Sequence, residues 1–173
     1  MKTLIISPLF PPDTGAPAPY VKELATRLGT STSLLIYGYL PERTQSVSIT
    51  AIDKRASLLL RLYHFTVALF NAQDVDCFLV NNAPSVELPF FIFYLLKRPR
   101  FVLIESDPLL QTNTPRGWYH FVHTYLSKHA KKVVTVSEAN YTKAELLPFT
   151  EFDTAKESVR ETWWKQHCNE LTA

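Results

Sequence analysis

A regular alternation of two kinds of segment constrains the fold more than any other feature of this chain. Short apolar runs rich in β-branched residues alternate with segments of helix length, and the runs cover residues 3–7, 32–38, 46–52, 76–82, 100–106 and 131–137. Most of them are apolar throughout, which is typical of parallel strands buried on both faces. Strands that alternate with helices are joined by right-handed crossovers. The sequence therefore predicts an α/β fold: a single Rossmann-like domain with a mostly parallel, doubly wound sheet.

The segments between these runs have helical character. In the first, Val21, Leu24, Ala25 and Leu28 recur at helical spacing, and Gly29 stands where a C-terminal cap belongs. Further helices are expected at about 55–72, 84–97 and 115–130. After the last run, Ser137 can cap a helix that Pro148 ends.

The helical segments at 55–72 and 84–97 are so apolar that one face can meet something besides the sheet. They have basic neighbours at Lys54, Arg55, Arg61, Lys97, Arg98 and Arg100. A peripheral membrane surface, a lipid-linked acceptor or a partner protein could use that combination. Core packing is the favoured explanation for most of the apolar residues, and charge at the helix C-termini is an alternative explanation for the basic ones.

The chain has room for one ordinary domain. It has 173 residues, of which 46% are hydrophobic. We expect a Rossmann-like domain over residues 1–149, followed by a C-terminal helix over 150–173 that packs on it through Trp163 or Trp164. Thr154 and Glu157 have capping-box spacing at the start of that helix.

Composition excludes several classes of function. The net charge is only +2, without a clustered basic stripe, so we expect no nucleic-acid partner. Cys77 and Cys168 have neither disulfide nor metal-ligand spacing, which is typical of a reduced cytoplasmic chain with no metal. The longest apolar run, residues 88–96, is far shorter than the roughly 20 residues that span a bilayer. We therefore expect a cytoplasmic protein, at most peripheral at the inner face of the membrane.

A stiff loop follows the first predicted strand. It runs from Ser7 to Pro19 and contains five prolines, with Gly15 as its only glycine. In open α/β sheets the turn from first strand to first helix is the usual phosphate site. The dinucleotide pattern G-x-G-x-x-G is absent, but a loop this rigid loses little entropy when it meets a ligand. A tight turn without a ligand is the alternative interpretation of Gly15.

Three stretches resemble one enzyme family. The opening "MKTLIISPLFPPDTGAPAPYVKELATRLG" resembles that of family-4-like GT-B glycosyltransferases, in which a "PP-x-x-G-G" loop precedes a helix ending in "L-A-x-x-L". The stretch "FVLIESDP" resembles the family's fifth strand, and "AKKVVTVSEANYTKAEL" resembles its "A-D-x-V-I-T-V-S" segment. The resemblance covers most of residues 1–147 and implies the N-terminal, acceptor-binding half of a GT-B fold.

The resemblance also implies a set of site residues. In the family the glycine-rich loop approaches the donor diphosphate, which gives that role to Gly15. The substrate-binding loop would also include Asp13 and Ala16, although Ala16 replaces the family's second glycine and would restrict the approach of the backbone. The polar candidates after the fifth strand are Glu105, Ser106 and Asp107, with Glu105 and Asp107 as catalytic candidates. Further substrate contacts are expected from Asn82, Ser137 and Glu138. Structural roles compete with these assignments, because Asp107 and Ser137 can each cap a helix and Asn82 can shape its loop.

The resemblance fails after about residue 147. There the family continues into a second domain with basic diphosphate clamps, whereas this chain passes into "LPFTEFDTAKESVRETWWKQHCNELTA". That tail resembles the family's last helix, which crosses back onto the N-terminal domain, and an ordinary final helix is the alternative.

We therefore expect the acceptor-binding half of an enzyme that transfers a sugar from a nucleotide-sugar donor, with no other cofactor. It would need a separate C-terminal half to complete its donor site and would be inactive alone; assembly into a homo-oligomer is the alternative partnership. The alternative is a non-catalytic binding or interaction module with the same fold. An unrelated α/β enzyme is disfavoured, because the histidines pair with no nucleophile and His120 and His123 are explained by a packed or solvated helix face.

Overall fold

The computed structural model describes residues 1–12, 17–38, 47–72, 74–105, 117–136 and 154–173. This part of the chain contains six strands and five α-helices, and a helix follows every strand except β2, which β3 follows. In order they are β1 (Thr3–Ser7), α1 (Pro17–Leu28), a 3-10 turn (Gly29–Ser31), β2 (Thr32–Tyr37), β3 (Ser48–Ile52), α2 (Leu58–Asn71), β4 (Cys77–Asn81), α3 (Pro84–Lys97), β5 (Phe101–Glu105), α5 (Trp118–His129), β6 (Lys132–Thr135) and α7 (Thr154–Thr172).

The six strands form one parallel sheet in the order β3-β2-β1-β4-β5-β6. Each neighbouring pair is parallel; Ile5 of β1, for example, lies beside Leu34 of β2 and Leu79 of β4. The α/β class and the single Rossmann-like domain predicted from the sequence are confirmed. The strand order reverses between β1 and β4, so this is the switch point at which such sheets usually bind ligands.

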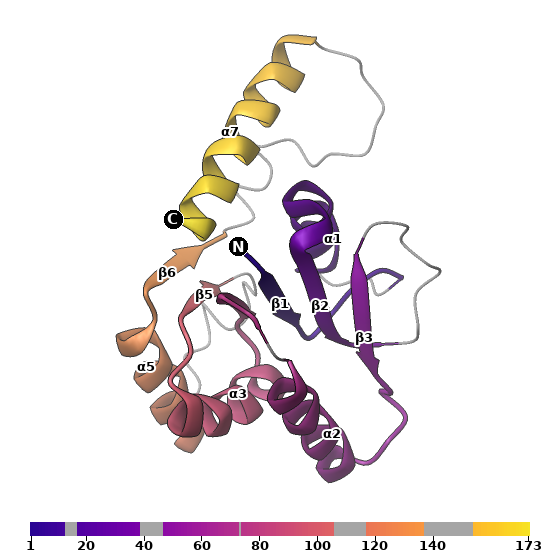
Figure 1. Ribbon diagram of the computed structural model, residues 1–173, viewed down its shortest axis with the longest axis vertical. Helices are drawn as coiled ribbons and strands as arrows, with labels where there is room; N and C mark the ends of the chain where they lie inside the picture. Colours follow the sequence, from indigo (N-terminus) through magenta and orange to yellow (C-terminus); the bar gives the residue numbers. More distant parts are fainter. Residues whose placement is uncertain (13–16, 39–46, 73, 106–116, 137–153) are drawn as a thin grey trace.

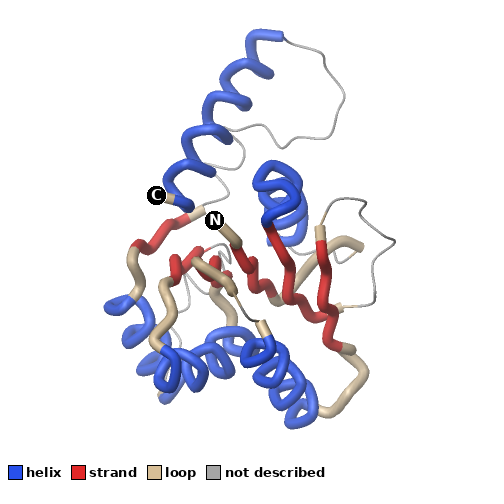
Figure 2. The backbone as a smooth tube through the Cα atoms, viewed as in Figure 1, coloured by secondary structure: helices blue, strands red, loops and turns tan. Residues whose placement is uncertain are grey.

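Helices cover both faces of the sheet, which explains why the central strands β1, β4 and β5 are mostly apolar and buried. Figure 1 shows α1 and α7 on one side of the sheet and α2, α3 and α5 on the other; Figure 2 shows the same layers by element type. Successive strand residues enter opposite cores: Ile5 belongs to the cluster with α1 and α7, whereas Leu4 and Ile6 belong to the cluster with α2, α3 and α5.

The helix boundaries follow the local chemistry. α1 ends at Leu28, and Gly29 follows with φ of 72°, the left-handed conformation that favours glycine at a C-terminal cap. α3 begins at Pro84, where a missing N–H costs nothing, and covers the predicted 84–97. The predicted helix between Ser137 and Pro148 lies outside the described residues.

α7 contributes to the core on the α1 side of the sheet. Trp164 is 0% exposed, stacks on Tyr20 with ring centroids 5.8 Å apart, and lies under the guanidinium of Arg27. Arg27 also donates to both carboxylate oxygens of Glu161 on α7, at 2.7 and 2.5 Å. The proposed boundary between residues 149 and 150 falls outside the described residues and stays a prediction.

No helix in the described part of the chain is both long and apolar enough to cross a membrane.

Candidate functional site

Polar residues end four neighbouring strands at the carboxyl edge of the sheet. Ser7 ends β1, Asn81 ends β4, Glu105 ends β5 and Thr135 ends β6. Ligands of open α/β sheets bind beyond this edge. The four residues therefore mark where a site can form, and their contacts show which of them serve the fold.

At the β1/β4 switch point the buried polar groups have structural partners. The hydroxyl of Ser7 donates to the carbonyl of Leu9 at 2.8 Å and accepts from the Leu9 amide at 3.3 Å, which turns the chain out of β1. Nδ2 of Asn81 donates across the switch point to the carbonyl of Ile6 on β1, at 3.3 Å. Both side chains are fully buried, so these bonds satisfy groups that would otherwise lose their contact with water.

Next to the switch point, a histidine lies between two carboxylates. Nδ1 of His123 on α5 donates to Oε1 of Glu87 on α3 at 2.8 Å. Its other nitrogen, Nε2, lies 3.6 Å from Oε1 of Glu105 at the end of β5. The hydroxyl of Thr135 donates to Oε2 of Glu105 at 3.0 Å. We call Glu87, His123, Glu105 and Thr135 the carboxylate–histidine cluster.

Electrostatics in this cluster favour the protonated imidazole. The hydrogen bond to Glu87 raises the pKa of His123 above its ordinary value, burial opposes this, and the charges of Glu87 and Glu105 add to the increase. Glu87 is 0% exposed, and within the described residues its Oε2 has no hydrogen-bond partner. A buried carboxylate with a hydrogen bond to only one of its two oxygens is costly unless a cation lies close to it. The cluster can therefore hold a proton between two carboxylates at the edge of the sheet.

Local sequence explains how the cluster forms. Glu87 lies in the first turn of α3, where the helix dipole stabilises a negative charge. α3 packs beside α5, and both helices start from the carboxyl edge, so Glu87 in the first turn of α3 and His123 in the second turn of α5 meet near the end of β5.

Of the candidate site residues predicted from the sequence, the structure describes two, Glu105 and Asn82. Glu105 lies in the carboxylate–histidine cluster. Asn82 is 3% exposed, and its backbone N–H donates to the carbonyl of Ile104, the residue before Glu105, at 2.9 Å. The other nominated residues lie outside the described part of the chain; they are Asp13, Gly15, Ala16, Ser106, Asp107, Ser137 and Glu138. Their assignments stay predictions.

Sequence reasoning missed Glu87 and His123. The interpretation of His123 as part of a packed or solvated helix face overlooked its carboxylate partners. One signal was available: Glu87 is the only acidic residue in the apolar segment "PSVELPFFIFYLLK", and a carboxylate buried in such a helix requires a cationic or hydrogen-bonding partner.

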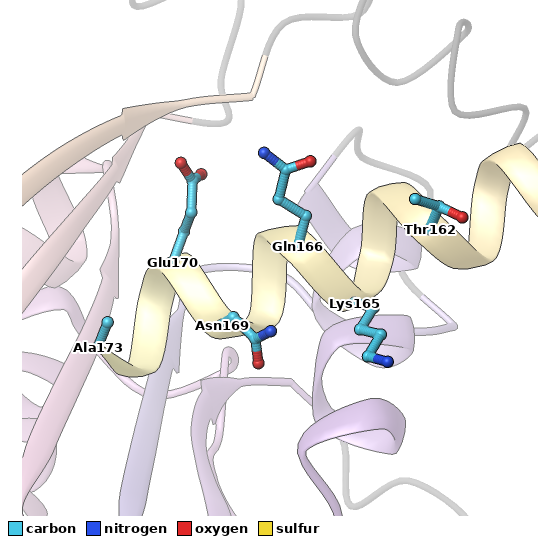
Figure 3. Close-up of a pocket in the computed structure, with 6 residues that line it drawn as sticks. All are labelled: Thr162, Lys165, Gln166, Asn169, Glu170 and Ala173. Atoms are coloured by element: carbon cyan, nitrogen blue, oxygen red, sulfur yellow. The ribbon is translucent and has the colours of Figure 1, made fainter.

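A shallow hollow on α7 is a weaker candidate. Side chains of this one helix line it: Thr162, Lys165, Gln166, Asn169, Glu170 and Ala173 (Figure 3). Figure 3 shows Gln166 and Glu170 projecting from one side of the helix, and Lys165 and Asn169 from the other. Glu170 forms an ion pair with Lys132, the first residue of β6, at 3.1 Å. The hollow therefore lies toward the opposite edge of the sheet from the carboxyl ends.

Neither a protein-family model nor a curated protein matches this chain. The resemblance to GT-B glycosyltransferases therefore stays a prediction drawn from the sequence.

Proposed function

We propose that this chain is the acceptor-binding half of a GT-B-type glycosyltransferase, which transfers a sugar from a nucleotide-sugar donor bound by a second, C-terminal-type domain. The observation that carries the proposal is the carboxylate–histidine cluster at the carboxyl edge, beside the β1/β4 switch point. The parallel sheet in the order 3-2-1-4-5-6 supports it as a compatible scaffold, although this fold alone serves many functions.

The charges of the cluster favour a sugar hydroxyl over a diphosphate. Glu87 and Glu105 face one imidazole, so the cluster carries a net negative charge even when His123 is protonated. A diphosphate would meet two carboxylates here, and phosphate groups are bound by Arg, Lys or helix N-termini. A neutral hydroxyl can donate to a carboxylate without that repulsion. The cluster thus suits the acceptor side of a transfer reaction.

Glu105 is the group that would act on the acceptor. Its carboxylate accepts a hydrogen bond from the acceptor hydroxyl, which makes that oxygen more nucleophilic. As the acceptor oxygen bonds to the anomeric carbon of the donor sugar, the bond from that carbon to the diphosphate breaks, the hydroxyl proton passes to Glu105, and the nucleoside diphosphate leaves on the second domain. His123 and Thr135 hold the Glu105 carboxylate from two sides, and Glu87 holds His123. In this scheme Glu105 contacts the acceptor, whereas His123 and Glu87 are positioning residues.

Saturation-transfer NMR tests the proposal with defined probes. The probes are the methyl glycosides of glucose, mannose, galactose and N-acetylglucosamine, together with UDP. We expect at least one glycoside to bind, and the variants Glu105→Gln and His123→Gln to weaken that binding by about tenfold, as expected for loss of a hydrogen bond to a charged group. Lys22→Gln, at an exposed site on α1, is the control and should bind like wild type.

Two results would contradict the proposal. If no glycoside binds to wild type, the cluster does not recognise sugar hydroxyls, and the chain is better described as a non-catalytic interaction module. If UDP binds more tightly than every glycoside and Glu105→Gln strengthens that binding, the edge is a donor site.

A further inference from the structure

The outer layer of helices on one face of the sheet exposes many large apolar side chains. Leu59 and Leu96 are 79% and 67% exposed, and each of the three helices contributes to the surface. We call this surface the α2/α3/α5 face, and six of its exposed residues are Leu59 and Tyr63 of α2, Ile92 and Leu96 of α3, and Trp118 and Phe121 of α5. Figure 1 shows the three helices side by side on the side of the sheet away from α1 and α7. Exposed apolar side chains gathered on one layer of helices are typical of sites of interaction.

The charge of this face has one sign. The three helices contain a single acidic residue, Glu87, which is buried against His123. Lys97 and Lys128 are exposed in the last turns of α3 and α5, and Arg98 is exposed immediately after α3. The described acidic residues nearest in sequence to α2 are Asp53, Asp74 and Asp76, and all three lie in loops beyond the helix ends. The face therefore combines exposed apolar groups with cations.

This combination argues against a second copy of the chain as the partner. In a symmetric contact through the face, Lys97, Arg98 and Lys128 of each copy would find no exposed acidic residue on the facing three helices to pair with, because their single acidic residue, Glu87, is buried. An anionic bilayer suits both the cations and the exposed apolar side chains of this face. The lipid phosphates pair with the cations, and the boundary of the acyl chains accepts the apolar side chains. Tyr63 and Trp118 are of the amphipathic aromatic type that concentrates at membrane interfaces.

We propose that the α2/α3/α5 face binds the surface of a bilayer containing anionic lipid. The inference is independent of the proposed sugar-transfer function, because it concerns the outer helix layer and requires nothing of the carboxylate–histidine cluster. Binding would be peripheral, with the helices lying on the membrane.

Vesicle co-sedimentation tests the proposal. One set of vesicles contains only phosphatidylcholine, and the other contains equal parts of phosphatidylcholine and phosphatidylglycerol. We expect wild type to bind the mixed vesicles at least about tenfold more tightly than the neutral ones, and molar salt to weaken the binding because it screens exposed charges. If wild type stays in the supernatant with the mixed vesicles at low salt, the proposal is wrong.

Matched charge-reversal variants separate this face from net charge. The double variant Lys97→Glu/Lys128→Glu alters the face, and Lys22→Glu/Lys165→Glu makes the same charge change at exposed positions on α1 and α7. We expect the first pair to lower affinity for mixed vesicles by about tenfold and the second to leave it within about twofold. Equal losses in both pairs would overturn the proposal, because net charge alone would then explain binding.

A third pair tests the apolar half of the argument. Leu59→Ser/Leu96→Ser removes two highly exposed apolar groups and should also weaken vesicle binding, with an unchanged melting temperature because neither side chain supports the core. Sedimentation velocity provides the opposing outcome. If wild type forms a dimer that this variant abolishes, and vesicle binding does not differ between the two proteins, the face is an interface between copies and the membrane proposal is overturned.

Discussion

His123 stabilises the fold most strongly while it is protonated, because its two neighbours are carboxylates. Its pKa is raised in the folded state, so its contribution is complete below its ordinary pKa near 6.5 and is lost as pH rises through the raised value. We expect His123→Gln to destabilise the protein by about 1–3 kcal/mol at pH 6 and by less at pH 9. Thermal unfolding of both proteins across this range measures the difference, and a gap that stays constant with pH would contradict the assignment.

His167 on α7 has the opposite dependence. Burial lowers its pKa to about 4, and a hydrogen bond of 2.7 Å joins its Nε2 to the hydroxyl of Tyr20. Between pH 6.5 and 4 the unfolded chain binds a proton that the folded chain does not, so stability falls by up to about 3 kcal/mol as pH drops through this window. Urea unfolding of wild type and His167→Gln at pH 7 and 4.5 tests this. The wild-type advantage should shrink at pH 4.5, and a gap equal at both pH values would show that His167 does not titrate in this window.

At the scale of residues, the sequence predicted only part of the cluster. Glu105 could be identified because it ends an apolar strand, where an unpaired buried carboxylate is costly. His123 could not, because helical spacing shows which face a residue occupies and not which side chain of another helix lies opposite. Glu87 and His123 are 36 residues apart in the chain, and only the packing of α3 against α5 brings them together.

At the scale of elements, α7 provides a matched pair of tryptophans. Trp164 is fully buried between Tyr20 and Arg27, whereas its neighbour Trp163 is partly exposed and stacks on His167 at 4.5 Å. We expect Trp164→Ala to lower the free energy of unfolding by about 3–5 kcal/mol, a large part of the 5–15 kcal/mol of a typical domain. Trp163→Ala should cost clearly less. Urea denaturation measures both, and equal effects would show that α7 is not docked through Trp164.

The strands were easier to predict than the layers they build. A strand buried on both faces, such as β1 or β4, is apolar at most of its positions, so its location is visible in the sequence. All six strands, including the more exposed edge strands β3 and β6, lie within the predicted runs. The exposed surface was harder to predict. Apolar residues of α2 and α3 that enter the core and those that stay outside have the same composition, and only packing separates Phe90, which is buried, from Leu96, which is exposed.

At the scale of the whole molecule, the alternation of strands and helices predicts the fold class, and the structure adds the strand order. The order places the reversal between β1 and β4 and so puts β4, β5 and β6 on one side of the switch point. All four residues of the carboxylate–histidine cluster come from elements on this side, namely α3, β5, α5 and β6. This division of the strands between the two sides of the switch point could not be derived from the sequence. The order of parallel strands depends on the side of the preceding strand to which each crossover connection leads, and the sequence does not show that side.

This arrangement predicts that a polypeptide of these 173 residues transfers no sugar by itself. A donor diphosphate carries at least two negative charges and must be held by cations, while the described part of the candidate site places Glu87 and Glu105 around a single imidazole. Incubation with radiolabelled UDP-glucose, UDP-galactose and GDP-mannose, each with the methyl glycosides as acceptors, should therefore give no product above a protein-free control. Addition of a separately expressed donor-binding domain should be required for turnover. Multiple turnovers by the polypeptide alone would show that this chain holds a donor without such a domain, and the acceptor-half assignment would have to be abandoned.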